Sequence, residues 1–270
     1  MTLLKVLLDA TKAAKEYVGE NLDRAQEFTG EKNRYGDQTL VLDINTEDEI
    51  IRVLNESGIS FGFLTEEQGF VRSSSTPEYL AIVDPIDGSS NIKRNIPLCT
   101  AGISIMPYKE SMTTDDAEIS VIDSFFTNET YVAIKGKGVT RNGKKVEVSK
   151  SSPIEETIVS YDTNRSWTKE FTKSSVRILD TVKDIRRTAS NLLDLCWTAS
   201  GSLDAMIDMR GILPIIHVSG THMVSEAGGY VVDASGNRLC LPIDIDTRMS
   251  FIAASNKDLA VSLYRVFISL

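Results

Sequence analysis

One stretch constrains the fold of this chain more than any other: an apolar run that ends abruptly in acidic and small polar residues. Residues 79–83 (YLAIV) are typical of a buried strand, and residues 84–91 (DPIDGSSN) follow directly. Asp84 and Asp87 offer anionic oxygens, and Pro85 forces a rigid turn after which the carbonyl of Ile86 can point the same way. This combination suits a hard metal ion that holds a phosphate.

The glycine and the serines of the same stretch add groups that suit an anion. Gly88 permits a close approach of the backbone, so the amides of Gly88 and Ser89 are expected to hold a phosphate oxygen at the start of a short helix. Ser90 is counted with them as a substrate-binding residue. Aspartate and glycine pairs are also common in ordinary turns, so this motif by itself is weak.

A second strand end lies eighteen residues upstream of Asp84. The run at 59–64 (ISFGFL) is strand-like and leads to Thr65, Glu66 and Glu67. If the two strands are neighbours in one sheet, Glu66 lies beside Asp84. The sequence therefore predicts an acidic centre built from two strand ends.

Three segments together resemble the inositol monophosphatase family, which comprises magnesium-dependent, lithium-sensitive phosphomonoesterases. They are the Glu66-Glu67 pair, DPIDGSSN at 84–91, and the segment from Gly220 to Gly229 with its E-A-G-G ending. The likeness runs from the first helix to the last strand. It implies a small phosphorylated polyol or sugar as substrate, and a homodimer. The run 208–211 (DMRG) resembles the archaeal branch, whose members often accept both inositol phosphates and fructose 1,6-bisphosphate.

The resemblance also implies roles for individual residues. Glu66, Asp84 and the Ile86 carbonyl would hold one Mg²⁺, and Asp84 with Asp87 would hold a second. Asp43, which could otherwise be a simple strand-end aspartate, would partner the hydroxyl of Ser89.

With Glu66, that hydroxyl would orient a metal-activated water for in-line attack, so Asp43, Glu66 and Ser89 are the expected catalytic residues. Lys32 matches a lysine on a loop over the metal site. Arg210 would pair with a second phosphate or a substrate hydroxyl, and a surface arginine at a strand end is the alternative.

The likeness breaks at Ile216. Counting back ten residues from Glu226 places Ile216 where the family has an aspartate that ligates the second metal. The second site is therefore expected to be weakened, with a higher magnesium requirement. His217 is adjacent, but neighbouring positions on a helix point about 100° apart. We therefore expect His217 to be packed or hydrogen-bonded, and not to replace the missing ligand.

The order of elements predicts an α+β half followed by an α/β half, in the family's layered α-β-α-β-α sandwich. Apolar spacing favours a helix from about 2 to 25, a strand at 40–42 leading to Asp43, and a helix capped by Asn45 or Thr46. The segment 30–37 is expected to be a mobile loop. We expect two units, 1–148 carrying most metal ligands and 149–270 completing the substrate site.

Composition limits the partners and the compartment. The chain has 270 residues and a net charge of −9, with no basic stripe, which argues against nucleic acid as a partner. No run of apolar residues is long enough for a membrane span, and the amino terminus lacks a signal peptide, so we expect a cytoplasmic protein. The three cysteines, at 99, 196 and 240, are expected to be buried reduced thiols.

Two other functions fit part of these observations. A catalytically impaired relative, acting as a metal-binding, ligand-binding or regulatory protein, would explain the loss of an aspartate at Ile216. A 3′-phosphoadenosine phosphatase is the alternative among enzymes, although no feature that would grip an adenine is evident.

Overall fold

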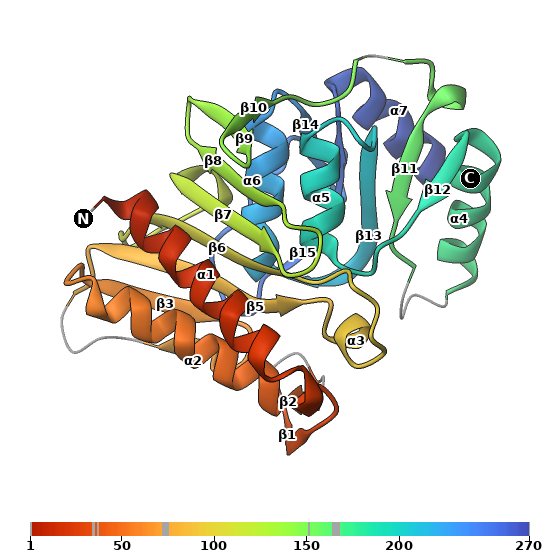
Figure 1. Ribbon diagram of the computed structural model, residues 1–270. Coiled ribbons are helices and arrows are strands. Elements are labelled where there is room, and N and C mark those ends of the chain that lie inside the picture. The colour runs from red at the N-terminus through yellow and green to blue at the C-terminus, as the bar shows by residue number, and fades with distance from the viewer. Residues whose placement is uncertain are drawn as a thin grey trace.

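The computed structural model describes residues 2–33, 36, 38–71, 76–150, 152–163 and 168–269. Helices and sheets alternate in five layers (Figure 1), which confirms the predicted α-β-α-β-α sandwich. Helices α1 (Leu3–Glu20) and α2 (Val41–Glu56) cover one sheet, and α4 (Lys169–Thr181) and α7 (Lys257–Ile268) cover the other. Helices α5 (Asn191–Ala199) and α6 (Val218–Glu226) lie between the two sheets.

The first sheet has eight strands in the order β10-β9-β8-β7-β6-β5-β3-β4. All neighbours are antiparallel except β3 and β5, which run parallel with Thr65 opposite Val83. The strands are β3 (Phe61–Thr65), β4 (Phe70–Val71), β5 (Tyr79–Asp87), β6 (Thr100–Pro107), β7 (Ile119–Ser124), β8 (Thr130–Ile134), β9 (Gly138–Arg141) and β10 (Lys144–Val146). The parallel pair brings the ends of β3 and β5 to the same edge.

The second sheet has five strands in the order β12-β11-β13-β15-β14. Strand β11 runs parallel to β12 and β13, whereas β15 runs antiparallel to β13 and β14. The bounds are β11 (Ile158–Tyr161), β12 (Asp184–Arg186), β13 (Ala205–Pro214), β14 (Tyr230–Asp233) and β15 (Arg248–Ala254). Helix α4 and strand β12 were not predicted from the sequence.

Three hydrophobic cores fill the spaces between the layers. One lies between α1, α2 and the first sheet, a second surrounds α5 and α6 between the sheets, and a third lies under α4 and α7. Gly220 allows α6 to approach α5 closely, because a Cβ there would lie 2.3 Å from Cδ1 of Leu195. Burial of these apolar surfaces is the main force that holds the layers together.

The first helix forms where apolar periodicity predicts it, although it ends five residues earlier than expected. Thr2 caps α1 by accepting a hydrogen bond from the backbone N–H of Lys5. The buried face consists of Val6, Leu7, Ala10, Thr11, Ala14 and Val18. A short 3₁₀ turn, η1 (Leu22–Arg24), follows; two others are η2 (Thr114–Asp116) and η3 (Ile154–Glu156).

Three local predictions were wrong. The strand β2 (Gln38–Leu40) ends before Asp43, which lies instead in the first turn of α2, so that helix begins earlier than Asn45. Residues 30–32 of the expected loop belong to β1 (Phe28–Lys32), which pairs with β2; Arg34, Tyr35 and Asp37 lie outside the described residues. Cys240 is exposed, whereas Cys99 and Cys196 are buried, and all three are free thiols.

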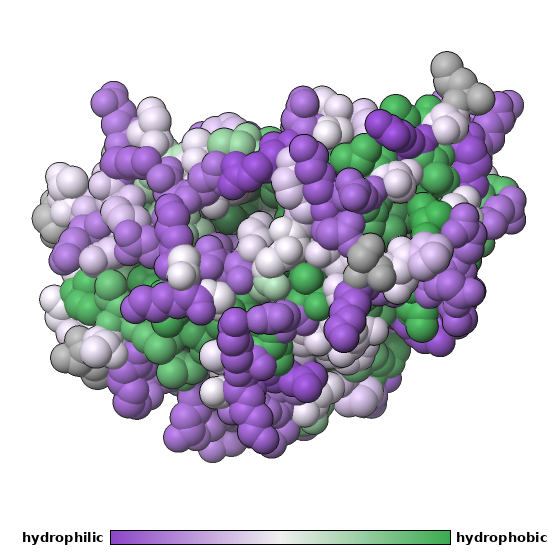
Figure 2. Space-filling model, turned by 90° about the horizontal axis from the view of Figure 1, so that it is seen from above, coloured by the Kyte–Doolittle hydropathy of each residue, from purple (hydrophilic) through white to green (hydrophobic). Residues whose placement is uncertain are grey.

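Among the described residues, no helix is both long and apolar enough to span a membrane. Hydrophilic residues dominate the face shown in Figure 2, and the hydrophobic residues on it gather in separate patches.

Candidate active site

A cleft of about 900 Å³ lies at the ends of strands from both halves of the chain. Residues of the first half and of the second half both line it. From the first half come Lys32, Asp43, Glu66, Asp87, Gly88, Ser89 and Ser90; from the second come Asp162, Arg187, Arg210 and His217. Most of the residues predicted to bind metal or substrate are therefore brought to one place.

The parallel pairing of β3 and β5 places Glu66 directly after one strand and Asp84 within the other. The expected proximity of Glu66 and Asp84 is confirmed, because Thr65 and Val83, the residues before them, lie opposite each other in the parallel pair. Burial, together with the charges of Asp84, Glu67 and Asp43, holds the pKa of Glu66 well above its usual range. Burial also raises the pKa of Asp84 to about 7.

Asp84 is fully buried, and neither of its carboxylate oxygens has a hydrogen-bond partner among the described residues. One oxygen of Asp43 is in the same situation. Burial and the charge of Glu67 hold the pKa of Asp43 well above its usual range, while the hydroxyl of Ser89 partly offsets the shift. Buried carboxylates without partners are costly, and a bound cation would satisfy them.

Asp87 is held by the start of the second half. Its Oδ2 accepts hydrogen bonds from Oγ of Ser190, at 2.7 Å, and from the backbone N–H of Leu192, at 2.6 Å. These donors belong to the N-terminal end of α5. Since both bonds use Oδ2, Oδ1 of Asp87 is left to face the cleft beside Asp84.

The turn after Asp87 requires glycine. Gly88 has a φ of 103°, and a Cβ there would lie 2.9 Å from the carbonyl oxygen of Leu98. Helix α3 (Ser89–Ile92) begins immediately after it, as predicted. The first N–H groups of a helix have no carbonyl partner within it, so those of Ser89 and Ser90 are available to an anion. The Ser89 hydroxyl donates to the Ile86 carbonyl at 3.1 Å.

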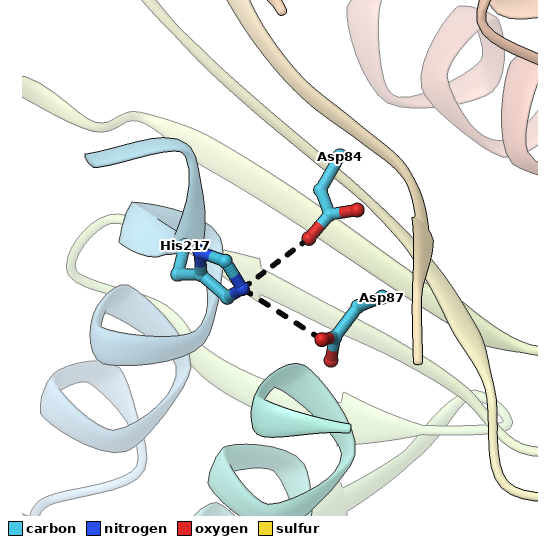
Figure 3. A group of neighbouring side chains, drawn as sticks. All are labelled: Asp84, Asp87 and His217. Carbon is cyan, nitrogen blue, oxygen red and sulfur yellow. Dashed lines mark ion pairs between the residues drawn. The ribbon is translucent and has the colours of Figure 1, made fainter. Parts of the chain in front are cut away.

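The position of His217 corrects the sequence prediction. Its ring points at Asp84 and Asp87 (Figure 3), with Nε2 3.5 Å from Oδ2 of Asp84 and 3.7 Å from Oδ1 of Asp87. Burial alone would lower the pKa of His217, but the two carboxylates outweigh burial and raise it. The ring is also buried and hydrogen-bonded, as expected, with Nδ1 3.2 Å from the Pro214 carbonyl.

Ile216 turns the other way. Its side chain is fully buried in the core between the sheets and does not line the cleft. Residues 215–217 form a single 3₁₀ turn, η4, between β13 and α6. The geometric argument that kept His217 away from the carboxylates fails, because it assumed that the side chain of residue 216 faces them.

The alternative that Arg210 is a surface arginine at a strand end is wrong. Arg210 lies within β13, and its side chain is only 6% exposed. It forms ion pairs with Asp208 and, at 3.0 Å, with Asp162. Asp162 also pairs with Arg187 at 2.9 Å. Two guanidinium groups that line the cleft are thus held by carboxylates.

Two acidic residues that sequence reasoning did not assign support the Glu66 turn. Glu47, buried in α2, accepts hydrogen bonds from the backbone N–H groups of Glu67 and Gln68 at 3.0 and 3.1 Å. Glu67 accepts from the hydroxyl of Thr39 at 2.7 Å. The sequence could have indicated this role of Glu47, because a glutamate on the apolar face of a predicted helix usually has a specific partner. Lys32 lies at the exposed end of β1 and lines the cleft.

Comparison with known proteins agrees with this geometry. The model of the inositol monophosphatase family matches residues 2–267. A fructose-1,6-bisphosphatase/inositol-1-monophosphatase of Methanothermobacter thermautotrophicus is 30% identical over 83% of this chain and 81% of its own. A bifunctional NADP phosphatase/NAD kinase of Methanococcus maripaludis is 28% identical over 98% of this chain, which spans 48% of that longer protein.

Among solved structures, the extragenic suppressor protein SuhB of Bartonella henselae superposes with a TM-score of 0.85 at 24% identity, covering 99% of this chain and 98% of its own. That likeness supports the fold. The fold and the acidic cleft define a phosphoric monoester hydrolase. The chain belongs to the inositol monophosphatase family, which is generally metal-dependent.

Proposed function

We propose that this protein is a Mg²⁺-dependent phosphomonoesterase that hydrolyses inositol monophosphate, sugar phosphates such as fructose 1,6-bisphosphate, or both. The observation that carries the proposal is the convergence of Glu66, Asp87 and the Gly88 turn in one cleft, with the buried carboxylate of Asp84 beside them. The names of archaeal relatives that act on both substrate classes support the choice of substrates.

The residues present fit a cation. Asp84 is buried, neither of its oxygens has a hydrogen-bond partner among the described residues, and the carboxyl groups of Glu66 and Asp87 lie near it. We propose that Glu66, Asp84 and the Ile86 carbonyl hold one Mg²⁺, with Asp84 and Asp87 at a second position. When bound, such ions neutralise developing charge on the phosphate and lower the pKa of a coordinated water.

The side chains of the chain then supply orientation and charge. Asp43 and Ser89 would align the attacking water together with Glu66, since Ser89 lies at the turn and influences the ionisation of Asp43. The N–H groups of Gly88 and Ser89 and the hydroxyl of Ser90 would hold phosphate oxygens. Lys32 at the cleft edge would add positive charge.

Arg210 is proposed to recognise a second phosphate or a substrate hydroxyl. Its guanidinium group is fixed by Asp208 and Asp162, so little conformational entropy is lost when it binds. A bisphosphate would use it more than a monophosphate. Substitution of Arg210 by Lys should therefore lower kcat/KM for fructose 1,6-bisphosphate more than for inositol 1-phosphate.

The test is phosphate release from inositol 1-phosphate, fructose 1,6-bisphosphate and 3′-phosphoadenosine 5′-phosphate while Mg²⁺ is titrated. Asp84→Asn is the matched variant, since the amide keeps the shape but removes the charge of a residue at the centre of the site. Turnover that requires Mg²⁺ and falls at least a hundredfold in the variant is expected. Absence of turnover on all three substrates would favour the catalytically impaired alternative.

The division of the chain follows the same reasoning. We propose that residues 1–148 form one unit and 149–270 the other, because the first sheet ends with β10 at Val146 and the second begins at Ile158. We also propose a cytoplasmic location, as the sequence suggested. Each unit contributes residues to the cleft, so neither would hold a complete site alone.

A further inference from the structure

Three possible ligand atoms converge beside the cleft, which Asp87 and His217 line. Asp84, Asp87 and His217 each offer one atom, and these atoms all lie within 4.8 Å of one another. Two ligands of one ion, each bound at about 2.0 to 2.2 Å, are separated by roughly 3 to 4 Å. The measured separations of 3.5 and 3.7 Å from Nε2 of His217 to the two carboxylates fall in this range.

The orientation of the imidazole ring suits a metal ligand. Nδ1 lies 3.2 Å from the Pro214 carbonyl, which can only accept a hydrogen bond. The proton of the neutral ring therefore sits on Nδ1, and the lone pair of Nε2 points at the carboxylates (Figure 3). A backbone carbonyl that fixes the tautomer in this way is a usual companion of a metal-binding histidine.

The two aspartates are also arranged to bind an ion. Oδ2 of Asp87 is occupied by Ser190 and Leu192, which fixes the carboxylate and leaves Oδ1 toward His217. Asp84 is fully buried, and neither of its oxygens has a hydrogen-bond partner among the described residues. A buried carboxylate without a hydrogen-bond partner, close to the other two groups, independently indicates that a ligand binds here.

We propose that Asp84, Asp87 and His217 form a mixed oxygen and nitrogen site that prefers a divalent transition-metal ion, such as Mn²⁺, Co²⁺ or Zn²⁺, to Mg²⁺. Imidazole nitrogen suits transition metals, whereas Mg²⁺ takes oxygen ligands almost exclusively. His217 thus supplies the third ligand that Ile216 cannot. Use of this ion in hydrolysis rests on the proposed function, but its binding does not.

The test uses full-length protein without a histidine tag, stripped of metal and loaded with one equivalent of Mn²⁺. Pulsed electron paramagnetic resonance detects modulation from a directly bound ¹⁴N nucleus, and titration of the free Mn²⁺ signal gives the Kd. Competition by Mg²⁺ gives the preference. The sequence contains two histidines, so His222→Ala is a matched control for His217→Ala. His222 is buried too, and Nδ1 of its ring is hydrogen-bonded to the hydroxyl of Ser120.

We expect nitrogen modulation in the parent and in His222→Ala, and a Mn²⁺ Kd at least tenfold below that for Mg²⁺. His217→Ala should lose the modulation and raise the Mn²⁺ Kd at least tenfold. His217→Gln, which keeps more of the side-chain volume, should do the same and serves if the alanine variant unfolds.

Two results would overturn the inference. One is bound Mn²⁺ without nitrogen modulation in the parent; the other is equal or tighter Mn²⁺ binding in His217→Ala, which would mean that the ring competes with the ion. Either result accompanied by Mg²⁺-dependent phosphate release would leave the proposed function intact. Nitrogen modulation without turnover on any substrate would support the metal site and contradict the proposed function.

Discussion

At the scale of single residues, the centre of the cleft is dominated by carboxyl groups that are short of partners. Glu66, Asp84 and Asp43 all have raised pKa values, chiefly because they are buried and secondarily because they repel one another. A protein without a cation must keep some of these groups protonated or accept the repulsion. Bound ions and folding stability should therefore be linked.

The first prediction concerns that link. Adding a divalent cation at a hundredfold excess over its Kd should stabilise the metal-free protein by about 2.7 kcal/mol. Asp84→Asn should lose most of this gain in stability, because a neutral amide attracts the cation less than a carboxylate does. Thermal unfolding with and without Mg²⁺ or Mn²⁺ measures both effects. An equal gain in the variant would place the stabilising ion elsewhere.

The second prediction concerns Asp194, buried in α5. Its Oδ2 accepts from Ser160 at 2.6 Å, while Oδ1 has no partner among the described residues, and burial raises its pKa to about 7. The folded state therefore holds the proton more tightly than the unfolded state. Stability contributed by this group is present at low pH and is lost as the pH rises from about 4 to about 7.

Asp194→Asn should therefore stabilise the metal-free protein by roughly 2 kcal/mol at pH 8, with the gain shrinking toward pH 4. Urea unfolding at several pH values measures the difference. Asp180→Asn, on the exposed side of α4, should show no comparable trend. A gain that does not vary with pH would contradict the assignment of the shift to Asp194.

At the scale of elements, close packing of α5 against α6 holds the middle layer. A Cβ at Gly220 would collide with Leu195 in α5, whereas a Cβ at Gly19, near the end of α1, would meet nothing within 4 Å. The same change of glycine to alanine should thus have opposite effects at the two positions. Alanine at position 220 adds a clash, whereas alanine at position 19 only reduces the backbone freedom of the unfolded chain.

The third prediction follows from this contrast. Gly220→Ala should destabilise the protein by about 1 to 3 kcal/mol. Gly19→Ala should be neutral or stabilise it by up to about 1 kcal/mol. Chemical denaturation of the two variants beside the parent makes the comparison. Equal effects would show that the α5 and α6 contact adapts without cost.

At the scale of the whole molecule, the cleft depends on the meeting of two halves that are far apart in sequence. Glu66 and Asp84 come from the first sheet, while His217 and Arg210 come from around β13 of the second. The bond from Ser190 to Asp87 joins the halves at the site itself. Loosening this contact would disturb the proposed metal site even without changing any of its residues.

The fourth prediction is the homodimer that the family resemblance implies. Light scattering coupled to gel filtration should give twice the monomer mass at micromolar concentration. Exposed apolar side chains, among them Phe28, Phe126 and Leu179, are available for a contact between subunits. A monomer mass at all concentrations tested would contradict the prediction.

Much of the fold and about half of the site were evident in the sequence because they depend on local pattern. The apolar run before Asp84 predicts β5, the glycine at 88 predicts the turn, and the apolar spacing after Thr2 predicts α1. The meeting of Glu66 with Asp84 was predictable as well, since carboxyl ends of neighbouring parallel strands share one edge.

Only the tertiary structure decided which residue at the start of α6 faces the carboxylates. The sequence pattern identified the loss of an aspartate at Ile216, but the direction of a side chain in a short 3₁₀ turn depends on the core against which it packs. Ile216 enters the apolar core between the sheets, and His217 is thereby turned toward Asp84 and Asp87. Local pattern thus determined the strands and the acidic turn, while packing between the layers determined which side chain faces Asp84 and Asp87.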